Sequence, residues 1–254
     1  ERDFSLDAGA VLEQITPNTR LLILNSPANP TGGAVPRAEI DKLVAGLVEC
    51  PQVAVLSDEI YSRISYDGRE HVSLLGYPEI ADRVILLDGW SKTYAMTGWR
   101  LGYAAGPTEL IKAMETIQSQ STSNPSSLAQ AAAIEALVGE QRQVGVMAAE
   151  FKKRRDYVVQ RLRKIPGFTC TLPEGAFYCF PRISGCFGMR WAGGTIHSAM
   201  DLALYLLEQA EVALVAGEGF GSSDNVRISY ATSIEILKAW LDKMEEAVSL
   251  LHPA

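Results

Sequence analysis

Short runs of consecutive apolar residues alternate with helical patterns in the first half of the chain. The runs occupy residues 21–24, 53–56, 84–87 and 101–105. The first three runs are continuous rather than alternating, which is typical of strands buried on both faces of a parallel sheet. Between the first two runs, apolar residues recur at helical spacing over residues 37–49. This succession of strand, helix and strand predicts an α/β fold with a largely parallel sheet.

The second half of the chain has a different pattern. Residues 128–163 are mostly helical, and Pro166-Gly167 then breaks the chain. The remainder predicts short strands at 168–172, 176–180, 212–215 and 226–229, helices at 198–210 and 233–250, and a glycine-rich surface loop at 186–194. We therefore expect residues 1–127 to belong to a large domain, 128–163 to form an interdomain helical region, and 164–254 to form a small α+β domain.

Polar side chains gather where the first three predicted strands end. They are Asn25 and Asn29 after the first strand, Asp58 and Tyr61 after the second, and Ser91 and Lys92 after the third. Ligands of parallel sheets bind beyond the carboxyl ends of the strands. The sequence therefore predicts a ligand site at this edge of the sheet.

Charge and composition narrow the class of protein. The 254 residues include 23 basic and 30 acidic side chains, a net charge of -7, which disfavours nucleic acid and anionic membranes as partners. The one basic run, residues 152–155, lies in a helical pattern beside acidic residues and predicts a solvated face. No apolar run reaches the roughly 20 residues of a membrane helix. The four cysteines have no zinc-site spacing, so we expect no metal and reduced thiols in a cytoplasmic protein.

Four motifs carry the candidate chemistry. They are NSPANPTG at 25–32, SDEIY at 57–61, SKTYAMTGWRLG at 91–102 and VRIS at 226–229. In this order they resemble the class I/II aminotransferases, enzymes of fold type I that depend on pyridoxal 5'-phosphate (PLP). The run IQSQSTSNP at 117–125 is similar to the bacterial aspartate aminotransferase subgroup. The resemblance covers essentially the whole chain and implies that residues 1–127 are the C-terminal part of a large PLP-binding domain.

The resemblance implies that Lys92 is the catalytic residue. Covalent cofactor chemistry needs a lysine that can lose its proton near neutral pH, which burial and a neighbouring cation favour. Lys92 follows a buried strand and precedes Arg100 by eight positions. In the family, the matching lysine binds PLP and then moves a proton between the amino-acid α-carbon and C4′ of the cofactor.

Further cofactor contacts are implied for residues around Lys92. Asp58 would pair with the pyridine nitrogen and keep it protonated, because an opposite charge favours the protonated form; Glu59 is expected to point elsewhere. Asn29 and Tyr61 would donate hydrogen bonds to the cofactor O3′.

The phosphate and the substrate have their own implied contacts. Ser91 and Arg100 would bind the phosphate. Many relatives have a serine three residues before the lysine, where this chain has Gly89. Arg227 would grip the substrate α-carboxylate together with Asn29, since a planar guanidinium suits a bidentate carboxylate. His71, His197 and His252 match no catalytic position and are expected to be solvated or structural.

The predicted activity is transfer of an amino group between an L-amino acid and a 2-oxo acid, in a homodimer. Residues 119–127 contain no arginine; the resembled subgroup handles dicarboxylates without one there, so aspartate is the favoured substrate, ahead of aromatic or neutral amino acids. A PLP lyase of the same fold and a non-catalytic regulatory domain are the alternatives. Relatives carry a long N-terminal portion before the point where this chain begins. We therefore expect an incomplete sheet with an aggregation-prone edge, and little activity from the 254 residues alone.

Overall fold

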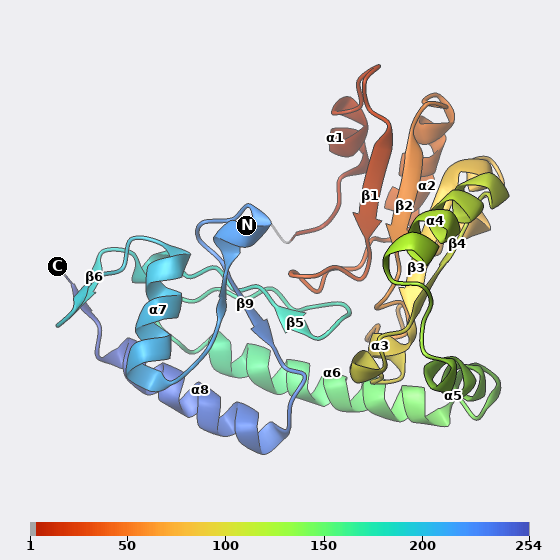
Figure 1. Ribbon diagram of the computed structural model, residues 1–254. Helices are drawn as coiled ribbons and strands as arrows, with labels where there is room; N and C mark the ends of the chain where they lie inside the picture. The colour runs from red at the N-terminus through yellow and green to blue at the C-terminus, as the bar shows by residue number, and fades with distance from the viewer. Residues whose placement is uncertain (1–3, 254) are drawn as a thin grey trace. The chain divides into compact units, whose positions relative to one another are not determined.

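The computed structural model describes residues 4–253, which divide into two compact units (Figure 1). The first unit comprises the chain up to Ala28 and residues 33–148. The second comprises residues 29–32 and the chain from Ala149 onward. The polypeptide therefore passes from one unit to the other three times, and the short segment 29–32 belongs to the second unit although both of its neighbours belong to the first.

A four-stranded sheet forms the centre of the first unit. Its strands are β1 (Leu21–Asn25), β2 (Ala54–Asp58), β3 (Val84–Gly89) and β4 (Gly102–Ala105), in the order β1-β2-β3-β4. The first three strands are parallel, and β4 is antiparallel to β3. This arrangement confirms the α/β fold with a largely parallel sheet.

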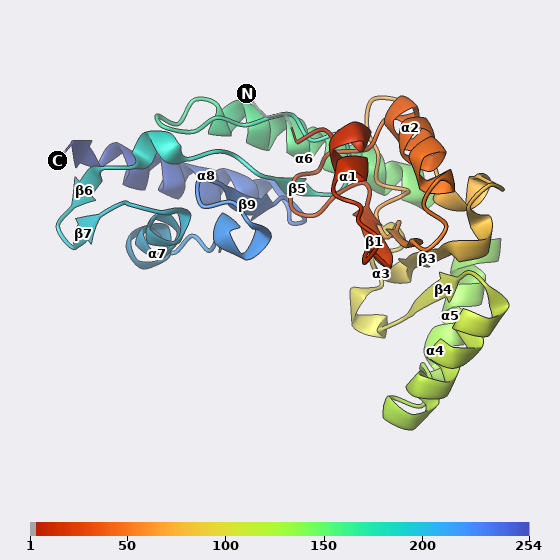
Figure 2. The same cartoon turned by 90° about the horizontal axis from the view of Figure 1, so that it is seen from above.

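Helices α1 (Ala8–Glu13) and α2 (Arg37–Val48) cover one face of this sheet (Figure 2). Helix α2 begins after Pro36, whose missing N–H costs nothing at a helix start. Its apolar residues Ile40, Leu43 and Leu47 are buried against sheet residues such as Val55. This core fixes the strands whose ends carry the candidate site.

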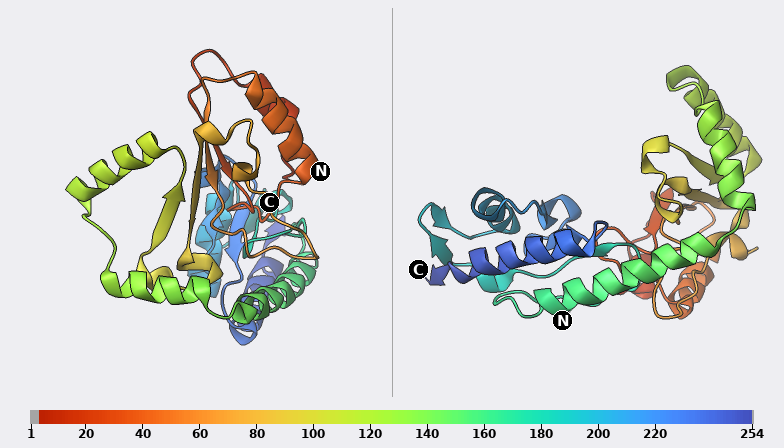
Figure 3. Two further views of the ribbon diagram at one scale, coloured as in Figure 1. Left: turned by 90° about the vertical axis from the view of Figure 1, so that its right-hand side faces the viewer. Right: turned by 90° about the horizontal axis from the view of Figure 1, so that it is seen from below.

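Helices α4 (Thr108–Ser121) and α5 (Ser127–Val138) lie on the other side of the sheet (Figure 3), and α3 (Trp90–Thr93) directly follows the end of β3. Trp90 of α3 packs with Ala133 of α5, and its Nε1 donates a hydrogen bond to the Ala133 carbonyl at 3.0 Å. Helix α4 has no buried residue. Short 3-10 helices lie at Leu74–Gly76, Ala81–Arg83 and Thr97–Trp99.

Helix α6 (Arg142–Leu162) carries the chain into the second unit, where α7 (Ala199–Ala210) and α8 (Ile234–Ser249) pack. Ser198 and Ser233 cap the last two helices through their hydroxyls, which accept backbone N–H bonds that a helix start otherwise leaves unpaired. One antiparallel sheet has the order β5 (Tyr178–Cys179), β9 (Val226–Ser229), β8 (Val215–Ala216). A second has the order β10 (His252–Pro253), β6 (Met189–Trp191), β7 (Gly194–Thr195). Two 3-10 helices, Ser184–Cys186 and Gly217–Phe220, complete the unit.

Three details of the second unit differ from the sequence-based expectations. Residues 168–172 form no strand and pair only through an isolated bridge between Thr169 and Arg182. The glycine-rich stretch 186–194 contains β6 and the start of the hairpin with β7 rather than a loop alone. Arg155, expected on a solvated face, is 1% exposed, and its guanidinium donates to the Pro173 carbonyl at 2.9 Å and pairs with Asp156. Within residues 4–253, no helix has the length and apolarity to cross a membrane, and no cluster of three potential metal ligands occurs.

Candidate active site

The carboxyl ends of β1 and β2 are tied together at the predicted edge. Asn25 pairs with Asp58 in the strand register, and its side-chain Nδ2 donates to the Asp58 carbonyl at 3.1 Å. The backbone N–H of Ser26 donates to the same carbonyl at 3.3 Å. The Asp58 carboxylate is half-buried and accepts the backbone N–H of Ile60 at 3.3 Å. Asp58 therefore lies at the end of β2, where hydrogen bonds from Asn25 and Ser26 hold its backbone.

Lys92 lies in α3, directly after β3, beside a buried tyrosine. Its Nζ is 6.0 Å from the centroid of the Tyr61 ring, and Tyr61 is 4% exposed. The hydroxyl of Thr97 donates to the Ser91 carbonyl at 3.0 Å and closes the turn after the lysine. A short helix anchored by Trp90 thus places one primary amine against an aromatic ring at the end of a buried strand.

Arg100 follows in the same turn with a left-handed backbone, at φ 54°. Its Nη1 donates to the Thr97 carbonyl at 3.0 Å, and the side chain is otherwise exposed. Ser91, Lys92 and Arg100 therefore come from one continuous turn.

Gly89 precedes this turn at a point of close backbone approach. A Cβ atom added there would lie 2.8 Å from Cα of Gly102 and 3.0 Å from the Leu101 carbonyl oxygen. Since those atoms belong to the backbone, they cannot move aside as a flexible side chain would. Gly89 therefore lies directly against Gly102 of β4, with no room for a side chain between the two strands.

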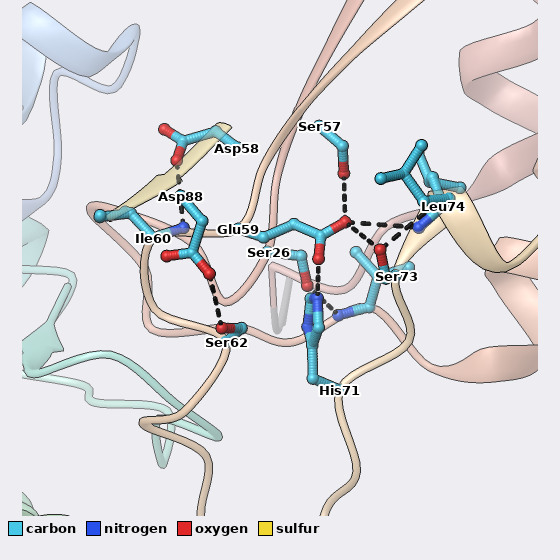
Figure 4. Close-up of polar contacts among 12 residues, drawn as sticks. Ser26, Ser57, Asp58, Glu59, Ile60, Ser62, His71, Ser73, Leu74 and Asp88 are labelled. Atoms are coloured by element: carbon cyan, nitrogen blue, oxygen red, sulfur yellow. Dashed lines mark hydrogen bonds and ion pairs between the residues drawn. The ribbon is translucent and has the colours of Figure 1, made fainter. Parts of the chain in front are cut away.

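Glu59 points away from Asp58 and enters a buried polar network (Figure 4). Its Oε1 accepts from the hydroxyls of Ser57 and Ser73, both at 2.9 Å, and from the Leu74 backbone N–H at 3.3 Å. Its Oε2 lies 2.7 Å from Nε2 of His71. Burial alone would raise the pKa of Glu59, but the hydrogen bonds and the imidazole outweigh it and lower that pKa.

Asp88 is a further half-buried carboxylate of this unit. Its Oδ1 accepts the Gly89 N–H at 2.6 Å, and its Oδ2 lies 3.4 Å from the Ser62 hydroxyl. Burial, reinforced by the negative charge of Glu59, raises the pKa of Asp88. Sequence reasoning missed Asp88 as a titratable group, because a strand-end aspartate before glycine reads as a turn signal.

In the second unit, Asn29 and Arg227 are brought together from opposite ends of the sequence. Nη1 of Arg227 donates to Oδ1 of Asn29 at 3.0 Å. The guanidinium carbon lies 5.0 Å from the Tyr178 ring centroid and 5.2 Å from that of Phe220. Nε of Arg227 is buried and has no hydrogen-bond partner among the described residues. A buried N–H group without an acceptor costs free energy unless a ligand supplies that acceptor.

Gly32, three residues after Asn29, is fixed by contacts within the second unit. Its carbonyl accepts the backbone N–H groups of Glu174 and Gly175, both at 2.8 Å. It has φ +71°, and a Cβ there would lie 2.6 Å from Cβ of Pro173, so only glycine suits the position. The NPTG motif is therefore pinned within the second unit beside the arginine.

The structure thus groups the predicted residues in two sets. Within the first unit it places Asp58 at the end of β2, Tyr61 beside Lys92, and Ser91 and Arg100 in the turn around the lysine. Within the second unit it joins Asn29 to Arg227. Sequence reasoning did not find Tyr178 and Phe220, because packing against a guanidinium has no sequence signature.

Known proteins are similar to this chain over most of its length. Residues 1–243 match the profile of the family described as aminotransferase class I and II. An aspartate/prephenate aminotransferase of Cereibacter sphaeroides is 49% identical over 94% of this chain and 60% of its own length. The aspartate aminotransferase of Geobacillus stearothermophilus is 44% identical over 99% of the chain and 61% of its own length.

Solved structures agree as well. The crystal structure of the aspartate aminotransferase from Rhizobium meliloti superposes with a TM-score of 0.93 at 45% identity, covering 97% of this chain and 62% of that one. The chain thus spans about three fifths of the length of the relatives it matches. With the motifs in order, the parallel sheet and these similarities, the chain belongs to the class I and II aminotransferases of fold type I.

Proposed function

We propose that the complete protein containing this chain is a PLP-dependent aminotransferase that exchanges an amino group between L-aspartate and a 2-oxo acid. The observation that carries the proposal is Lys92, which follows a buried strand and lies 6.0 Å from the Tyr61 ring in a chain 44–49% identical to aspartate aminotransferases. The names of the relatives support aspartate as amino donor, and prephenate, itself a 2-oxo acid, as one acceptor.

The donor set of the first unit fits PLP. The cofactor, when bound, supplies an electron sink for the carbanion that forms at the substrate α-carbon. Lys92 would bind it covalently and act as the general base, with Nζ accepting the proton from the substrate α-carbon and donating it to C4′ of the cofactor. Asp58 would pair with the pyridine nitrogen. Tyr61 would donate a hydrogen bond to the phenolic oxygen.

The phosphate would be held by the turn around Lys92. The Ser91 hydroxyl and the Arg100 guanidinium supply a donor and a charge. Gly89 supplies no hydroxyl, so this chain would have one side-chain contact fewer than many relatives.

Substrate recognition is assigned to Asn29 and Arg227. The planar guanidinium, fixed by Asn29 and by the rings of Tyr178 and Phe220, suits a bidentate α-carboxylate. The buried Nε without a partner among the described residues supports a site awaiting an anionic ligand. Asn29 would also donate from Nδ2 to the cofactor.

Assembly and location form part of the same proposal. The resemblance implies a homodimer in the cytoplasm. All four cysteines carry free thiols in the structure, which suits a reducing compartment.

The test begins with PLP added to the complete protein and to its Lys92→Ala variant. A visible absorption band that forms in the first and not in the second supports the assignment of Lys92. L-aspartate and 2-oxoglutarate are then supplied, and oxaloacetate and ammonia are measured. Oxaloacetate with matching glutamate and no ammonia supports transfer; ammonia release would instead indicate a lyase.

A further inference from the structure

The buried carboxylate of Glu59 connects two separate parts of the first unit. Four groups surround it: the hydroxyls of Ser57 and Ser73, the backbone N–H of Leu74 and the imidazole of His71 (Figure 4). Ser57 precedes the candidate cofactor aspartate, whereas the other three lie in residues 71–74. The network therefore connects the end of β2 to residues 71–74 through hydrogen bonds of the Glu59 side chain.

The pair of Glu59 and His71 is a costly way to fill a buried position. The side chains are 5% and 17% exposed, and their closest atoms are 2.7 Å apart. A buried carboxylate with its polar partner stabilises a fold no better than apolar side chains of similar volume, because the polar groups lose their hydration. What such a pair does supply is a fixed geometry, since a displaced partner leaves a buried charge unpaired.

That geometry bears directly on Asp58. Glu59 directly follows the last residue of β2, and the carboxylates of Asp58 and Glu59 point in different directions (Figure 4). The carbonyl of Asp58 is held by Asn25 and Ser26. That carbonyl belongs to the peptide that joins Asp58 to Glu59, so the bonds from Asn25 and Ser26 and the locked Glu59 side chain hold the same peptide. The hydroxyl of Ser57, bound to Oε1 of Glu59 at 2.9 Å, connects the residues before and after Asp58 and thereby fixes the direction of the Asp58 carboxylate.

We propose that Glu59 and His71 are positioning residues for Asp58, acting through the backbone of β2. The inference rests on the proposed function of Asp58 as the partner of the cofactor nitrogen. It also gives a role to a histidine that matches no catalytic position in the sequence.

The test compares His71→Leu, which removes the polar partner, with His71→Gln, whose Nε2 can replace the imidazole donor. Ile40→Val is the matched control, because it weakens the core of the same unit without touching the network. Amide hydrogen exchange of residues 57–62 is measured by mass spectrometry in the complete protein without cofactor. Exchange about tenfold faster in His71→Leu, near wild type in His71→Gln and unchanged in Ile40→Val is expected. Unchanged exchange in His71→Leu overturns the proposal.

A second measurement addresses the cofactor. The Kd for PLP is expected to rise about tenfold in His71→Leu, which corresponds to about 1.4 kcal/mol, and to recover in His71→Gln. Equal affinities in His71→Leu and Ile40→Val would refute a role in cofactor binding. Failure of the wild type to form a Lys92-dependent absorption band would refute the proposed function instead, while the exchange measurement still judges the positioning pair.

Discussion

Oδ1 of Asn29 accepts a hydrogen bond from Nη1 of Arg227 at 3.0 Å, across 198 positions of sequence. The bond holds one edge of the guanidinium, and the rings of Tyr178 and Phe220 lie within 5.0 and 5.2 Å of its central carbon. A planar cation fixed in this way has little freedom to lose when it binds a carboxylate. Both the fixed orientation of the guanidinium plane and its positive charge would therefore favour binding of a substrate carboxylate.

Replacing Arg227 by lysine tests the importance of the plane. Arg227→Lys keeps the charge and loses the fork of donors, so kcat/KM for L-aspartate is expected to fall about 100-fold, or ~3 kcal/mol. Steady-state kinetics on the complete protein measures the change. Arg182→Lys is the control, because Arg182 pairs with Asp224 on the surface of the same unit. Equal losses in both variants would contradict the assignment.

Lys92→Ala is expected to abolish the cofactor absorption band and to lower kcat by more than about 10³-fold, since the covalent anchor and the general base are lost together. The comparison is Lys112→Ala, a lysine that is 67% exposed and paired with Glu109 on α4. That control should keep both band and rate. A Lys92→Ala protein with an unchanged spectrum would show that another amine binds the cofactor.

Gly89→Ser would introduce the hydroxyl that the family resemblance leads one to expect here, at a position without room for a side chain. The added Cβ would meet the Gly102 backbone at 2.8 Å, so the free energy of unfolding is expected to fall by about 1–3 kcal/mol. Chemical denaturation measures this loss. Gly98→Ala is the control, because a Cβ there meets nothing within 4 Å. A serine variant as stable as the wild type would mean that β3 and β4 can separate at this point.

The lowered pKa of Glu59 predicts how stability depends on pH. A carboxyl group with a lowered pKa in the folded state stabilises the fold above its unfolded pKa, and this contribution is lost as pH falls through the folded value. Glu59→Gln is therefore expected to cost about 3 kcal/mol near neutral pH and progressively less in acid. Urea unfolding of both proteins at several pH values tests this. Glu109→Gln, with a 92% exposed carboxylate, should show no such trend; a Glu59→Gln cost independent of pH would contradict it.

The sheet was predictable because its strands are encoded locally. Continuous apolar runs located β1, β2 and β3 within a residue or two, and Pro36, Ser198 and Ser233 marked helix starts through their own chemistry. In the second unit the strands β5 and β8 have two residues each and are shorter than the strands expected at 176–180 and 212–215. The positions of such short strands are set by partners distant in sequence. For the same reason the strand expected at 168–172 is only an isolated bridge between Thr169 and Arg182.

The candidate site shows the same division. The sequence motifs identified Lys92, Asp58 and Arg227 as candidate site residues. They did not predict that His71 pairs with Glu59, because His71 lies 12 positions away in an irregular segment whose path no periodicity predicts. Arg155 illustrates the limit for charge patterns. All four residues of the basic run pair with acidic residues of α6, but the guanidinium of Arg155 is also buried and reaches the Pro173 carbonyl.

The membership of residues 29–32 in the second unit has a consequence for the order of events during synthesis. These residues are made before their partners at Gly175 and Arg227, which leave the ribosome later. Contacts of such long sequence separation form late, because a long loop must close first. The pairing of Asn29 with Arg227 can therefore form only after the 198 positions that separate them have been made, and truncation anywhere before Arg227 removes it entirely.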